Sequence, residues 1–588
     1  MSAADLAIVG LYLAVVIGVG IWYQQRAAKD LDAYFLGGKS LPWPALAMSG
    51  AVSNFDLTGT MWMVSVMYVL GMQSWWQHWM WGVTMPAFTL AYLARWVRRS
   101  RVMTAAEWMR TRFGEDAGGR VARYASAAMA VVVTAAAIGY AFQGIGKFAA
   151  VYFPLAPLAA RLPVGGEWLV EHQRAVLATA ILAVTTLYVV MGGLYSVVVT
   201  DVIQTIVLTV AALWIAGFAW WHVSPAEIAA HVPPGFVRVT PSWRLEHLES
   251  TDQEAYAAFG FLTAAWVVKG LLLNAGGPAQ MYDAQRFLAA RTVRDAAKIA
   301  AAWPFFLVAR WAMVAGITLL ALTAFASASD PEEVMPWVLK EHLPAGVRGI
   351  VVAGLLAAFM STFSSTVNAG AAFVVRDLWQ PLVRPAAVER HLVRVSYLAT
   401  VGIVAAGIAI GRQASSIGGI WSWMMMALTA GAIVPNVLRW HWWRMNGWGY
   451  AAGIAGGLLL TLVPQVLGTT PDYVLFAGIC LGALVASVVV SLATPPTAPA
   501  VLAEFRRTVR PFGWWGPVRM EGAVPRGETA GRSLGNAFLA MAGITCLYLA
   551  PMYFVGHWYA RAAACGLGFA AAALVLWRTW YRHLAEEE

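Results

Sequence analysis

The chain has 588 residues, of which 60% are apolar and 12% are charged, and its mean hydropathy is +0.64. Soluble globular domains carry about 25% charged residues, so this composition excludes an ordinary soluble enzyme, a nucleic-acid-binding protein and a disordered scaffold. In a bilayer, a chain of this length predicts one bundle of many spanning helices. The formal net charge of +10 then indicates basic loops on the cytoplasmic side of the membrane.

Apolar stretches of about 20 residues, long enough to cross a bilayer as a helix, recur along the whole chain. They predict an all-α integral membrane protein with about fifteen transmembrane helices. In chain order the predicted spans are 5–23, 42–61, 70–94, 120–152, 175–191, 195–222, 256–275, 300–326, 347–377, 392–410, 416–440, 448–467, 472–494, 534–554 and 558–580. The first stretch differs from a cleavable signal, because no basic residue precedes it.

The 40 Lys and Arg residues gather in alternate loops between the predicted spans. Most of them lie in the loops that are cytoplasmic if the N-terminus is outside, and basic loops mark the cytoplasmic side. We therefore expect a multi-pass protein of the plasma (inner) membrane, with its N-terminus outside and its C-terminus in the cytoplasm.

The spans predict a core of two five-helix groups with further helices before and after it. The predicted divisions are 1–41 (leading helix and inner loop), 42–222 (first five-helix repeat), 223–255 (external loop), 256–440 (second five-helix repeat), 441–494 (two trailing helices), 495–533 (cytoplasmic linker) and 534–588 (two C-terminal helices and tail). Because five is an odd number, the second repeat must cross the membrane upside down relative to the first.

The opening helix of each repeat is interrupted near its middle, by SNFDLTG at 53–59 and by NAGGP at 274–278. Gly and Pro are common in membrane helices in general. Two matching breaks in inverted repeats, however, are typical of transporters, whose substrate and ion sites lie at such breaks near the middle of the bilayer. The pattern therefore predicts a transporter.

Hydroxyl side chains crowd one turn of a later apolar helix, at Ser361, Thr362, Ser364 and Ser365. Such hydroxyls commonly bond back to carbonyls of their own helix. Asp201 adds a carboxylate within another span, and a carboxylate there is costly unless it is paired or binds an ion. An oxygen-only set suits a hard cation such as Na⁺, although a proton could use Asp201 and Asp56 instead.

Five stretches of the chain are similar to the sodium:solute symporter family, which includes sodium/glucose and sodium/proline carriers. They are AYFLGGKSLPWPA (33–45), GGLYSVVVTDVIQ (192–204), AQRFLAARTVRDAAK (284–298), LLAAFMSTFSSTVNAGAAFVVRDLW (355–379) and AIVPNVLRWHWWRMNGWGYAAGIAGG (432–457). They occur in the same order as in the family, and together they identify the family more specifically than any single stretch does. The resemblance implies a five-plus-five inverted repeat of the LeuT type.

The resemblance also implies where sodium binds. The site found throughout the family corresponds here to the carbonyls of Val52, Phe55 and Ala358 and the side chains of Ser361 and Thr362. Some members have a second sodium site, and its positions match Asp201, Ser361, Ser364 and Ser365. Na⁺ is therefore the expected coupling ion, and two ions per cycle is a hypothesis.

The substrate pocket is the part in which the family varies, so its residues are predicted from the chain itself. Asp56 is a candidate for contact with a cationic or hydroxyl-rich solute, a sodium ion or a proton, and its alternative role is to cap the helix at the break. Residues 73–81 form an aromatic and amide cluster. An aromatic belt at the membrane interface is the default interpretation of this cluster, and a pocket for a sugar-like or quaternary-amine solute is the alternative. The candidate substrate residues are Asn54, Asp56, Gln77, Trp79, Tyr140, Asn274 and Gln280.

Two cations, Lys269 and Arg310, also lie within predicted spans. They could neutralise a carboxylate solute, pair with Asp56 or extend towards an interface.

We predict a secondary active transporter that couples inward movement of Na⁺ to uptake of a small organic solute by alternating access. The alternatives are a non-transporting membrane sensor with a carrier fold and a proton-coupled symporter. No P-loop or HExxH pattern occurs in the sequence, and no enzyme is predicted. The expected partners are the solute and the lipid bilayer, with no nucleic acid and no obligate protein partner.

Overall fold

The computed structural model of the chain describes most of its length as helix. It describes residues 1–27, 41–100, 102, 108–245, 257–277, 286–324, 330–462, 471–518 and 528–584. Within these ranges the segments are helices and turns, with one isolated bridge between Trp442 and Trp514. The predicted all-α class is confirmed.

The leading helix α1 (Ala3–Ala27) packs along α12 and α19. Its first turn carries Asp5, whose carboxylate accepts hydrogen bonds from the backbone N–H groups of Gly346 and Gly349 at the start of α19 (Val347–Ala372). Because the first N–H groups of a helix have no partner within the helix, this carboxylate caps α19. It therefore fixes one end of the helix that carries Ser361 and Thr362.

The helix that opens the first predicted repeat is broken, as the sequence predicts. It consists of α3 (Trp43–Ser53) and α4 (Leu57–Leu70), and the chain bends by 53° between them. At the break, the N–H groups of Asn54 and Phe55 bond to the carbonyls of Ala51 and Val52, which closes the end of α3. Asp56 begins α4 by accepting from the N–H groups of Thr58 and Gly59, so its predicted role as a helix cap is confirmed.

Beyond α4 the chain turns at Gly71, whose φ is +68°, and continues through η2 (Gly71–Ser74), α5 (Trp75–Trp79), η3 (Met80–Thr84), α6 (Met85–Phe88), η4 (Thr89–Leu93) and α7 (Ala94–Arg99). The next long helices are α9 (Ala117–Tyr152) and α12 (Gln173–His222). The spans predicted at 175–191 and 195–222 both lie within the element α12, of which Val198–His222 by itself is long and apolar enough to cross a membrane. The Gly192–Gly193 pair between them costs a helix about 1 kcal/mol per residue but blocks none of its hydrogen bonds.

In the second half, α15 (Phe259–Ala275) ends at the predicted break, and Gly277 there has a φ of +119°. It is followed by α17 (Val293–Ala324), α19 with its extension η6 (Phe373–Trp379), and α21 (Glu389–Gly411).

The span predicted at 416–440 is bent by 43° between Ile417–Leu428, which comprises α22 (Ile417–Ser422) and η7 (Trp423–Leu428), and α23 (Ala430–His441). This bend was absent from the sequence prediction. The widened turns of η7 and Pro435 within α23 explain it, because both interrupt regular helical hydrogen bonding.

Two helical hairpins complete the bundle. The pair α24 (Gly447–Leu460) and α26 (Asp472–Ala493) packs on α23, and the pair α28 (Ala530–Val555) and α29 (Tyr559–Thr579) packs on α17. Among the described residues, eight helices are long and apolar enough to cross a membrane, or ten if each bent pair is one span. The predicted number of about fifteen includes shorter helices such as α15 and α24.

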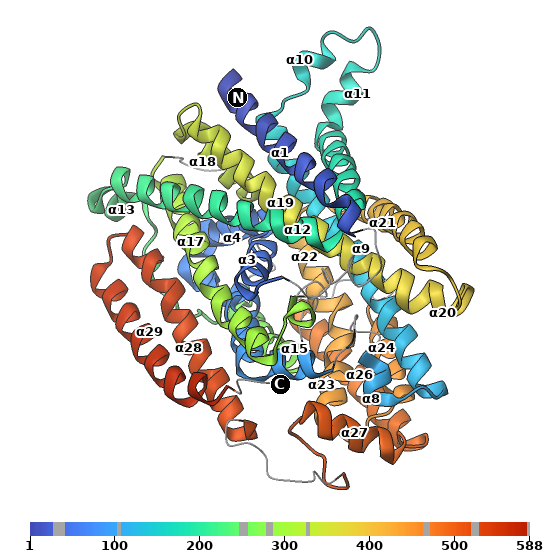
Figure 1. Cartoon of the computed structure of the whole chain (residues 1–588). Coiled ribbons are helices and arrows are strands. Elements are labelled where there is room, and N and C mark those ends of the chain that lie inside the picture. Colours follow the sequence, from blue (N-terminus) through green and yellow to red (C-terminus); the bar gives the residue numbers. More distant parts are fainter. Residues whose placement is uncertain are drawn as a thin grey trace.

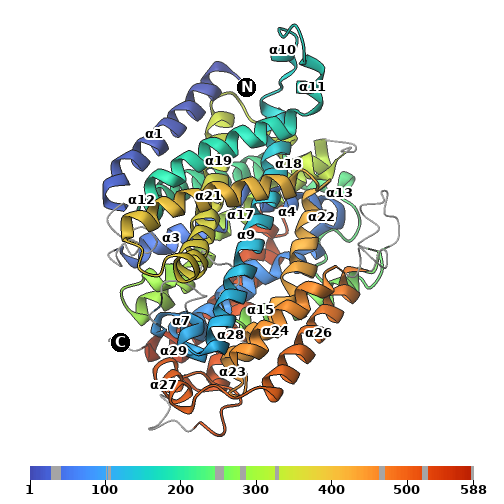
Figure 2. The same cartoon turned by 90° about the vertical axis from the view of Figure 1, so that its right-hand side faces the viewer.

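The short connecting helices divide between the two ends of the bundle. The N-terminus, α10 (Ala156–Ala159), α11 (Gly166–Glu171) and α18 (Val334–His342) lie at the upper end in both views, whereas α8 (Trp108–Phe113) and α27 (Pro499–Val509) lie at the lower end (Figures 1 and 2). Below, the upper end is called the N-terminal end and the lower end the α27 end.

Candidate functional site

A cavity of about 240 Å³ begins at the break between α3 and α4 and extends towards the α27 end of the bundle. Asn54, Asp56 and Gly59 line it at the break. Along α9 its wall runs from Tyr140 to Ser126, and its far end is formed by Asn436, Arg439 and Tyr450. A cavity of this size is slightly smaller than most small-molecule sites, which span about 300–1,000 Å³. It includes the predicted substrate position at the break and reaches Arg439 and Tyr450 towards the α27 end.

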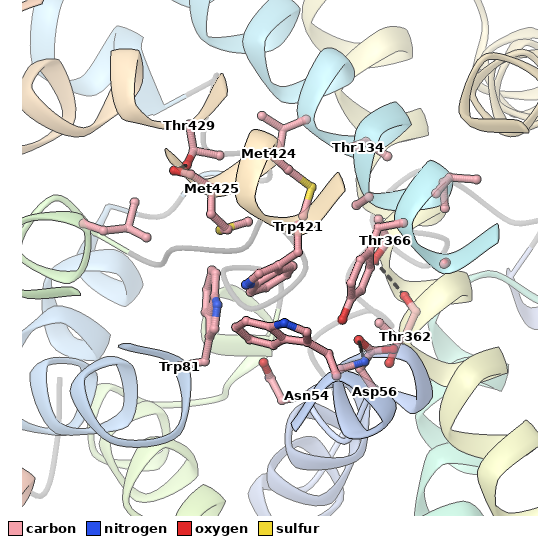
Figure 3. Close-up of a pocket in the computed structure, with 18 of the residues that line it drawn as sticks. Asn54, Asp56, Trp81, Thr134, Thr362, Thr366, Trp421, Met424, Met425 and Thr429 are labelled. Carbon is pink, nitrogen blue, oxygen red and sulfur yellow. Dashed lines mark hydrogen bonds between the residues drawn. The ribbon is translucent and has the colours of Figure 1, made fainter. Parts of the chain in front are cut away.

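Aromatic side chains surround the cavity where it meets the break. Trp421 is the centre of the group, with ring centroids 5.5 Å from Trp62, 6.1 Å from Trp81 and 5.1 Å from Tyr140. His78 stacks edge-on against Trp62 at 4.4 Å. Figure 3 shows the indoles of Trp81 and Trp421, together with Asn54, Asp56 and Thr362, among the side chains that line the cavity. These rings give the cavity broad apolar faces next to a few polar groups, as is usual in small-molecule sites.

One arginine holds the break in its bent shape. Arg310 on α17 donates to the carbonyl oxygens of Asn54 (2.8 Å) and Asp56 (3.1 Å) and to Thr60 Oγ1 (2.9 Å). A Cβ atom on Gly59 would lie 2.9 Å from Asp56 Oδ2 and 3.1 Å from both Arg310 Nη2 and the Tyr140 hydroxyl. A carboxylate, a guanidinium and a phenol therefore converge over Gly59, where any side chain would collide with them.

The N-terminal end of the bundle is closed by charged groups. Lys147 Nζ on α9 lies 2.7 Å from Asp330 Oδ2 and 2.8 Å from Glu332 Oε2. Glu332 also accepts from the N–H groups of Ile417 (2.9 Å) and Gly418 (2.7 Å) at the start of α22. One carboxylate thus ties α9 and α22 to the segment that precedes α18. Together with the Trp62–Trp421 contact, the group of Lys147, Asp330 and Glu332 closes the cavity towards the N-terminal end of the bundle.

The residues predicted for the first sodium site lie on two facing elements. Thr362 Oγ1 on α19 lies 2.7 Å from the carbonyl oxygen of Ser53 and 3.1 Å from that of Ala358. Ser361 Oγ lies 3.2 Å from Ser53 Oγ. The end of α3, with Val52 and Phe55, therefore packs against the turn of α19 that carries Ala358, Ser361 and Thr362. These groups supply only oxygen atoms, which fits Na⁺, and sodium binding by them stays a prediction.

Asp201 on α12 is completely buried and has three polar neighbours. Its Oδ1 accepts from Ser361 Oγ at 2.6 Å, its Oδ2 accepts from Ser49 Oγ, and Arg286 Nη2 lies 3.6 Å from Oδ2. Ser365 also belongs to this group, because Arg286 donates to its Oγ at 2.7 Å. Ser364 instead donates to the carbonyl of Ser361 in its own helix. Asp201, Ser361 and Ser365 are thus brought together as predicted, but around an arginine that the sequence reasoning did not place there.

The remaining predicted substrate residues differ in their positions. Asn54, Asp56 and Tyr140 line the cavity, whereas Gln77, Trp79 and Asn274 are absent from its wall. The Asn274 amide donates to the carbonyl of Gly270, one turn earlier in α15. Gln280 lies outside the described residues.

Part of the aromatic cluster of residues 73–81 is internal, so the default interpretation of an interfacial belt is wrong for Trp75, His78 and Trp81, whereas Trp76 and Trp79 are half-buried. Trp75 is fully buried against Trp311, with ring centroids 4.4 Å apart, and Trp76 donates to the carbonyl of Val239. His78 and Trp81 line the cavity. Trp75 and His78 pack against Trp311 on α17, and Trp81 packs against Trp421 on α22, helices that only the tertiary structure brings near them.

The two predicted spanning cations have different surroundings. Arg310 lies at the break beside Asp56, as described above. Lys269 is buried with its Nζ 4.6 Å from the Trp266 ring centroid, and no hydrogen-bond partner for it lies among the described residues. Lys269 is absent from the wall of the cavity.

Four functional residues escaped the sequence reasoning: Arg286, Ser49, Trp62 and Trp421. Arg286 had a usable signal, because a buried carboxylate such as Asp201 calls for a nearby cation and Arg286 stands in the stretch AQRFLAA. No signal in the sequence marks Trp62 and Trp421, since a tryptophan in an apolar helix has the same sequence pattern whether its indole faces lipid, the core or a cavity.

Comparisons with known proteins agree with this architecture. The model of the sodium:solute symporter family matches residues 34–457. The chain is 24% identical over 493 residues to a sodium/glucose cotransporter of Vibrio parahaemolyticus, covering 79% of this chain and 85% of the relative. It is 27% identical over 506 residues to sodium/myo-inositol cotransporter 2 of Mus musculus, covering 79% and 70%.

A solved structure is similar over most of its length. It is a Na⁺-coupled sialic acid symporter in a substrate-bound outward-open state, with a TM-score of 0.64 and 16% identity, and the alignment covers 84% of this chain and 99% of that one. At this identity the similarity concerns the fold.

Proposed function

Because the chain belongs to the sodium:solute symporter family, and is therefore a sodium-coupled solute symporter of the membrane, we propose that it carries a small, neutral, hydroxyl-rich solute. The observation that carries this proposal is the cavity wall, in which Trp62, Trp81, Trp421 and Tyr140 surround the polar groups of the break. Aromatic rings can cover the apolar faces of a sugar or cyclic polyol, while Asn54 and Asp56 offer hydrogen bonds to its hydroxyls.

The charge of the cavity favours a neutral solute. Asp56 and Arg310 both line it, and their opposite charges balance each other. A quaternary amine would suit the aromatic rings, but it would bring an uncompensated positive charge into a buried site. The names of two relatives, which describe glucose and myo-inositol cotransport, also support a polyhydroxylated solute.

We propose that one sodium ion binds at the carbonyls of Val52, Phe55 and Ala358 and the side chains of Ser361 and Thr362. The contacts of Ser53 with Ser361 and Thr362 support this site, because they join the broken helix to α19. An ion held by both elements would couple their positions, and the solute site lies at the same break. Sodium and solute would then share a free energy of interaction, which must be reciprocal.

We also propose that the structure is inward-facing. In the predicted topology the N-terminus is outside and the C-terminus is in the cytoplasm. The α27 end then faces the cytoplasm, and the cavity extends towards this end. The Lys147–Glu332 group then closes the external side. The residue ranges 42–222 and 256–440 are proposed as the two inverted repeats, with the bend in α3–α4 and the end of α15 at Ala275 as their matching breaks.

The experiment is uptake by the purified protein in liposomes. Labelled glucose, myo-inositol, choline and a monocarboxylate are offered with an imposed Na⁺ gradient, and K⁺ replaces Na⁺ in the parallel series. We expect uptake of a polyol, dependent on Na⁺. Uptake of choline alone would overturn the neutral-solute proposal.

Two pairs of variants test the sites in the same assay. Trp81→Ala is expected to reduce uptake at least about tenfold, equivalent to 1.4 kcal/mol, whereas Trp79→Ala, away from the cavity, should have little effect. Thr362→Ala should raise the Na⁺ concentration needed for half-maximal uptake, whereas Thr318→Ala, whose hydroxyl bonds within α17, should not. Equal effects within either pair would contradict the corresponding site.

A further inference from the structure

The helix α21 (Glu389–Gly411) has one buried face and one exposed face. It is long and apolar enough to cross a membrane, and it lies at the right-hand edge of the bundle in Figure 1. Leu392 and Val393 are buried against the region where α19 continues into η6. Leu398 and Val401, on another side of the helix, are 74% and 54% exposed. In a membrane, this exposed apolar face contacts the acyl chains of lipids.

Two arginines extend the exposed face to the start of the helix. Arg390 and Arg394 are exposed and stand one turn apart, on the same side as the exposed apolar residues. Arg384 precedes them in the hydrogen-bonded turn before α21. None of these three side chains has an ion-pair or hydrogen-bond partner among the described residues. Since Glu389 is the single acidic residue in 380–394, this end of α21 carries a net positive charge.

The residues around these arginines match the boundary between lipid headgroups and acyl chains. Trp379, at the end of η6, packs against His391 with ring centroids 5.1 Å apart, and tryptophan favours the headgroup region. Leu398 and Val401 follow Arg394 by about 6 and 11 Å along the helix axis. The charged part of α21 therefore lies at the level of the headgroups, and its apolar part lies at the level of the acyl chains.

We propose that this face of α21 binds an anionic phospholipid, with its phosphate at Arg390 and Arg394 and an acyl chain along Leu398 and Val401. A guanidinium binds phosphate oxygens through two parallel hydrogen bonds. A zwitterionic phospholipid carries a positive amine next to its phosphate, so its net attraction to the arginines is weaker. In the predicted topology the lipid belongs to the cytoplasmic leaflet. These residues do not line the cavity, so the inference goes beyond the proposed function.

A second copy of the chain fits this face less well than a lipid does. In a symmetric dimer the same patch of both copies forms the interface. Arg390 and Arg394 of the two copies would then face each other, with one carboxylate, Glu389, on each side, and like charges repel each other. An anionic headgroup instead neutralises the arginines.

The bound lipid would act on the cavity through α9. Gly407 on α21 packs so closely on α9 that a Cβ atom there would lie 2.4 Å from Ile138 Cβ. Gln143 on α9 also donates to the carbonyl of Gly411 at 2.6 Å. Ile138 lines the cavity, so a lipid that holds α21 at one depth in the membrane also holds this wall. We therefore expect the rate of solute uptake to depend on anionic lipid.

The first test measures which lipid lies beside α21. A fluorophore is attached to Val401→Cys in protein whose three native cysteines are replaced by serine, and the protein is reconstituted in phosphatidylcholine liposomes. Brominated phosphatidylglycerol, which quenches nearby fluorophores, is then added. The control position is Leu481→Cys, which is the same number of residues from the cytoplasmic end of α26, a lipid-facing helix without Lys or Arg.

We expect brominated phosphatidylglycerol to quench position 401 more strongly than position 481, and brominated phosphatidylcholine to quench both equally. Equal quenching of the two positions by the anionic lipid would overturn the inference. Disulfide cross-linking of Val401→Cys between two copies would show a second copy on this face and would also overturn it.

The second test removes the charges. Arg390→Gln/Arg394→Gln should weaken the binding of phosphatidylglycerol beside position 401 about thirtyfold, equivalent to about 2 kcal/mol. Arg390→Lys/Arg394→Lys keeps the charges and should keep most of the preference for the anionic lipid. Arg578→Gln/Arg582→Gln removes two exposed arginines at the end of α29 and should leave position 401 unchanged. An equal loss in the α21 and α29 variants would mean that the net charge of the protein, and no site on α21, attracts the lipid.

The third test measures Na⁺-driven uptake in liposomes with and without phosphatidylglycerol. We expect the initial rate of the wild-type protein to change with this lipid and that of Arg390→Gln/Arg394→Gln to lose the response. The same response in both proteins would contradict the site. Uptake that still depends on Na⁺ in phosphatidylcholine alone would leave the proposed function intact in either case.

Discussion

Two arginine–carboxylate pairs lie along the same broken helix, one half-buried and one fully buried, and they differ in what else each arginine contacts. Arg310, beside Asp56, donates to two backbone carbonyls at the break, and both residues line the cavity. Arg286, beside Asp201, donates to three hydroxyl groups and is completely buried, away from the cavity wall. Backbone carbonyls are fixed by the fold, whereas hydroxyls can rotate towards another cation. The first pair therefore lies at the proposed solute site, and the second joins α3, α12 and α19 beside the proposed sodium site.

The largest expected effect is that of Arg310→Gln. The change leaves the Asn54 and Asp56 carbonyls without their donors and leaves Asp56 without a positive partner. Hydrogen bonds to charged groups are worth about 1.5–3 kcal/mol each, and Arg310 makes three of them at the break, so we expect solute uptake to fall at least about a hundredfold. The measurement is the initial rate of Na⁺-driven uptake in liposomes.

The matched variant Arg310→Lys keeps the charge and should recover part of the uptake. Arg286→Lys and Arg310→Lys should differ in kind, because the first is expected to preserve sodium binding while the second lowers the affinity for the solute. If both variants changed the same quantity, the distinction between the two pairs would be lost.

A smaller effect is expected at a third charged group, which ties α9 and α22 to the segment before α18 and does not line the cavity. Lys147→Gln removes the positive charge between Asp330 and Glu332, so closure of the N-terminal end should weaken. We expect a cysteine at position 63, introduced into the cavity wall as Met63→Cys, to react about threefold to tenfold faster with a thiol reagent applied from outside, equivalent to about 1 kcal/mol.

The background for this measurement is the protein with Cys480, Cys546 and Cys565 replaced by serine. Lys340→Gln, a change at the end of α18 away from the Lys147 group, serves as the control. Faster labelling in the control, or unchanged labelling after Lys147→Gln, would show that this group does not close the external side.

The smallest effect concerns Glu528, which lies outside the spans at the start of the C-terminal hairpin. Burial raises its pKa, but hydrogen bonds from Arg99 and the charges of Arg99, Arg95 and Arg510 outweigh this effect and lower the pKa below its usual value. Its contribution to stability is therefore present above the usual pKa of a glutamate and is lost as the pH falls through the lowered value.

We expect Glu528→Gln to lower the melting temperature by about 1–2 °C at pH 7, corresponding to ~1 kcal/mol, and to have no effect once the wild-type carboxylate is protonated. Thermal unfolding in detergent, followed by tryptophan fluorescence across this pH range, measures the difference. A decrease that is the same at acidic and neutral pH would point to lost packing in place of a lost ion pair. Glu504→Gln, at an exposed pair with Arg507, should change less.

Much of the fold could be predicted from the sequence because its signals are local. Hydropathy located the long helices, and Gly and polar residues located the breaks at 53–59 and 274–278. The bend before α23 was missed because it comes from widened turns in η7, which leave no clear mark in composition.

By itself the sequence determined that the protein is a helical membrane protein, that its core helix is broken beside Asp56, and that Ser361 and Thr362 stand in one polar turn. Length, hydropathy and spacing along one helix decide these features. Only the tertiary structure decided which arginine stands beside which carboxylate, and that Trp62 and Trp421 join Trp81 around the cavity. These contacts join helices that are distant in the chain, and the free energy that selects them comes from pairing buried charges and packing side chains across helices, which no local pattern records.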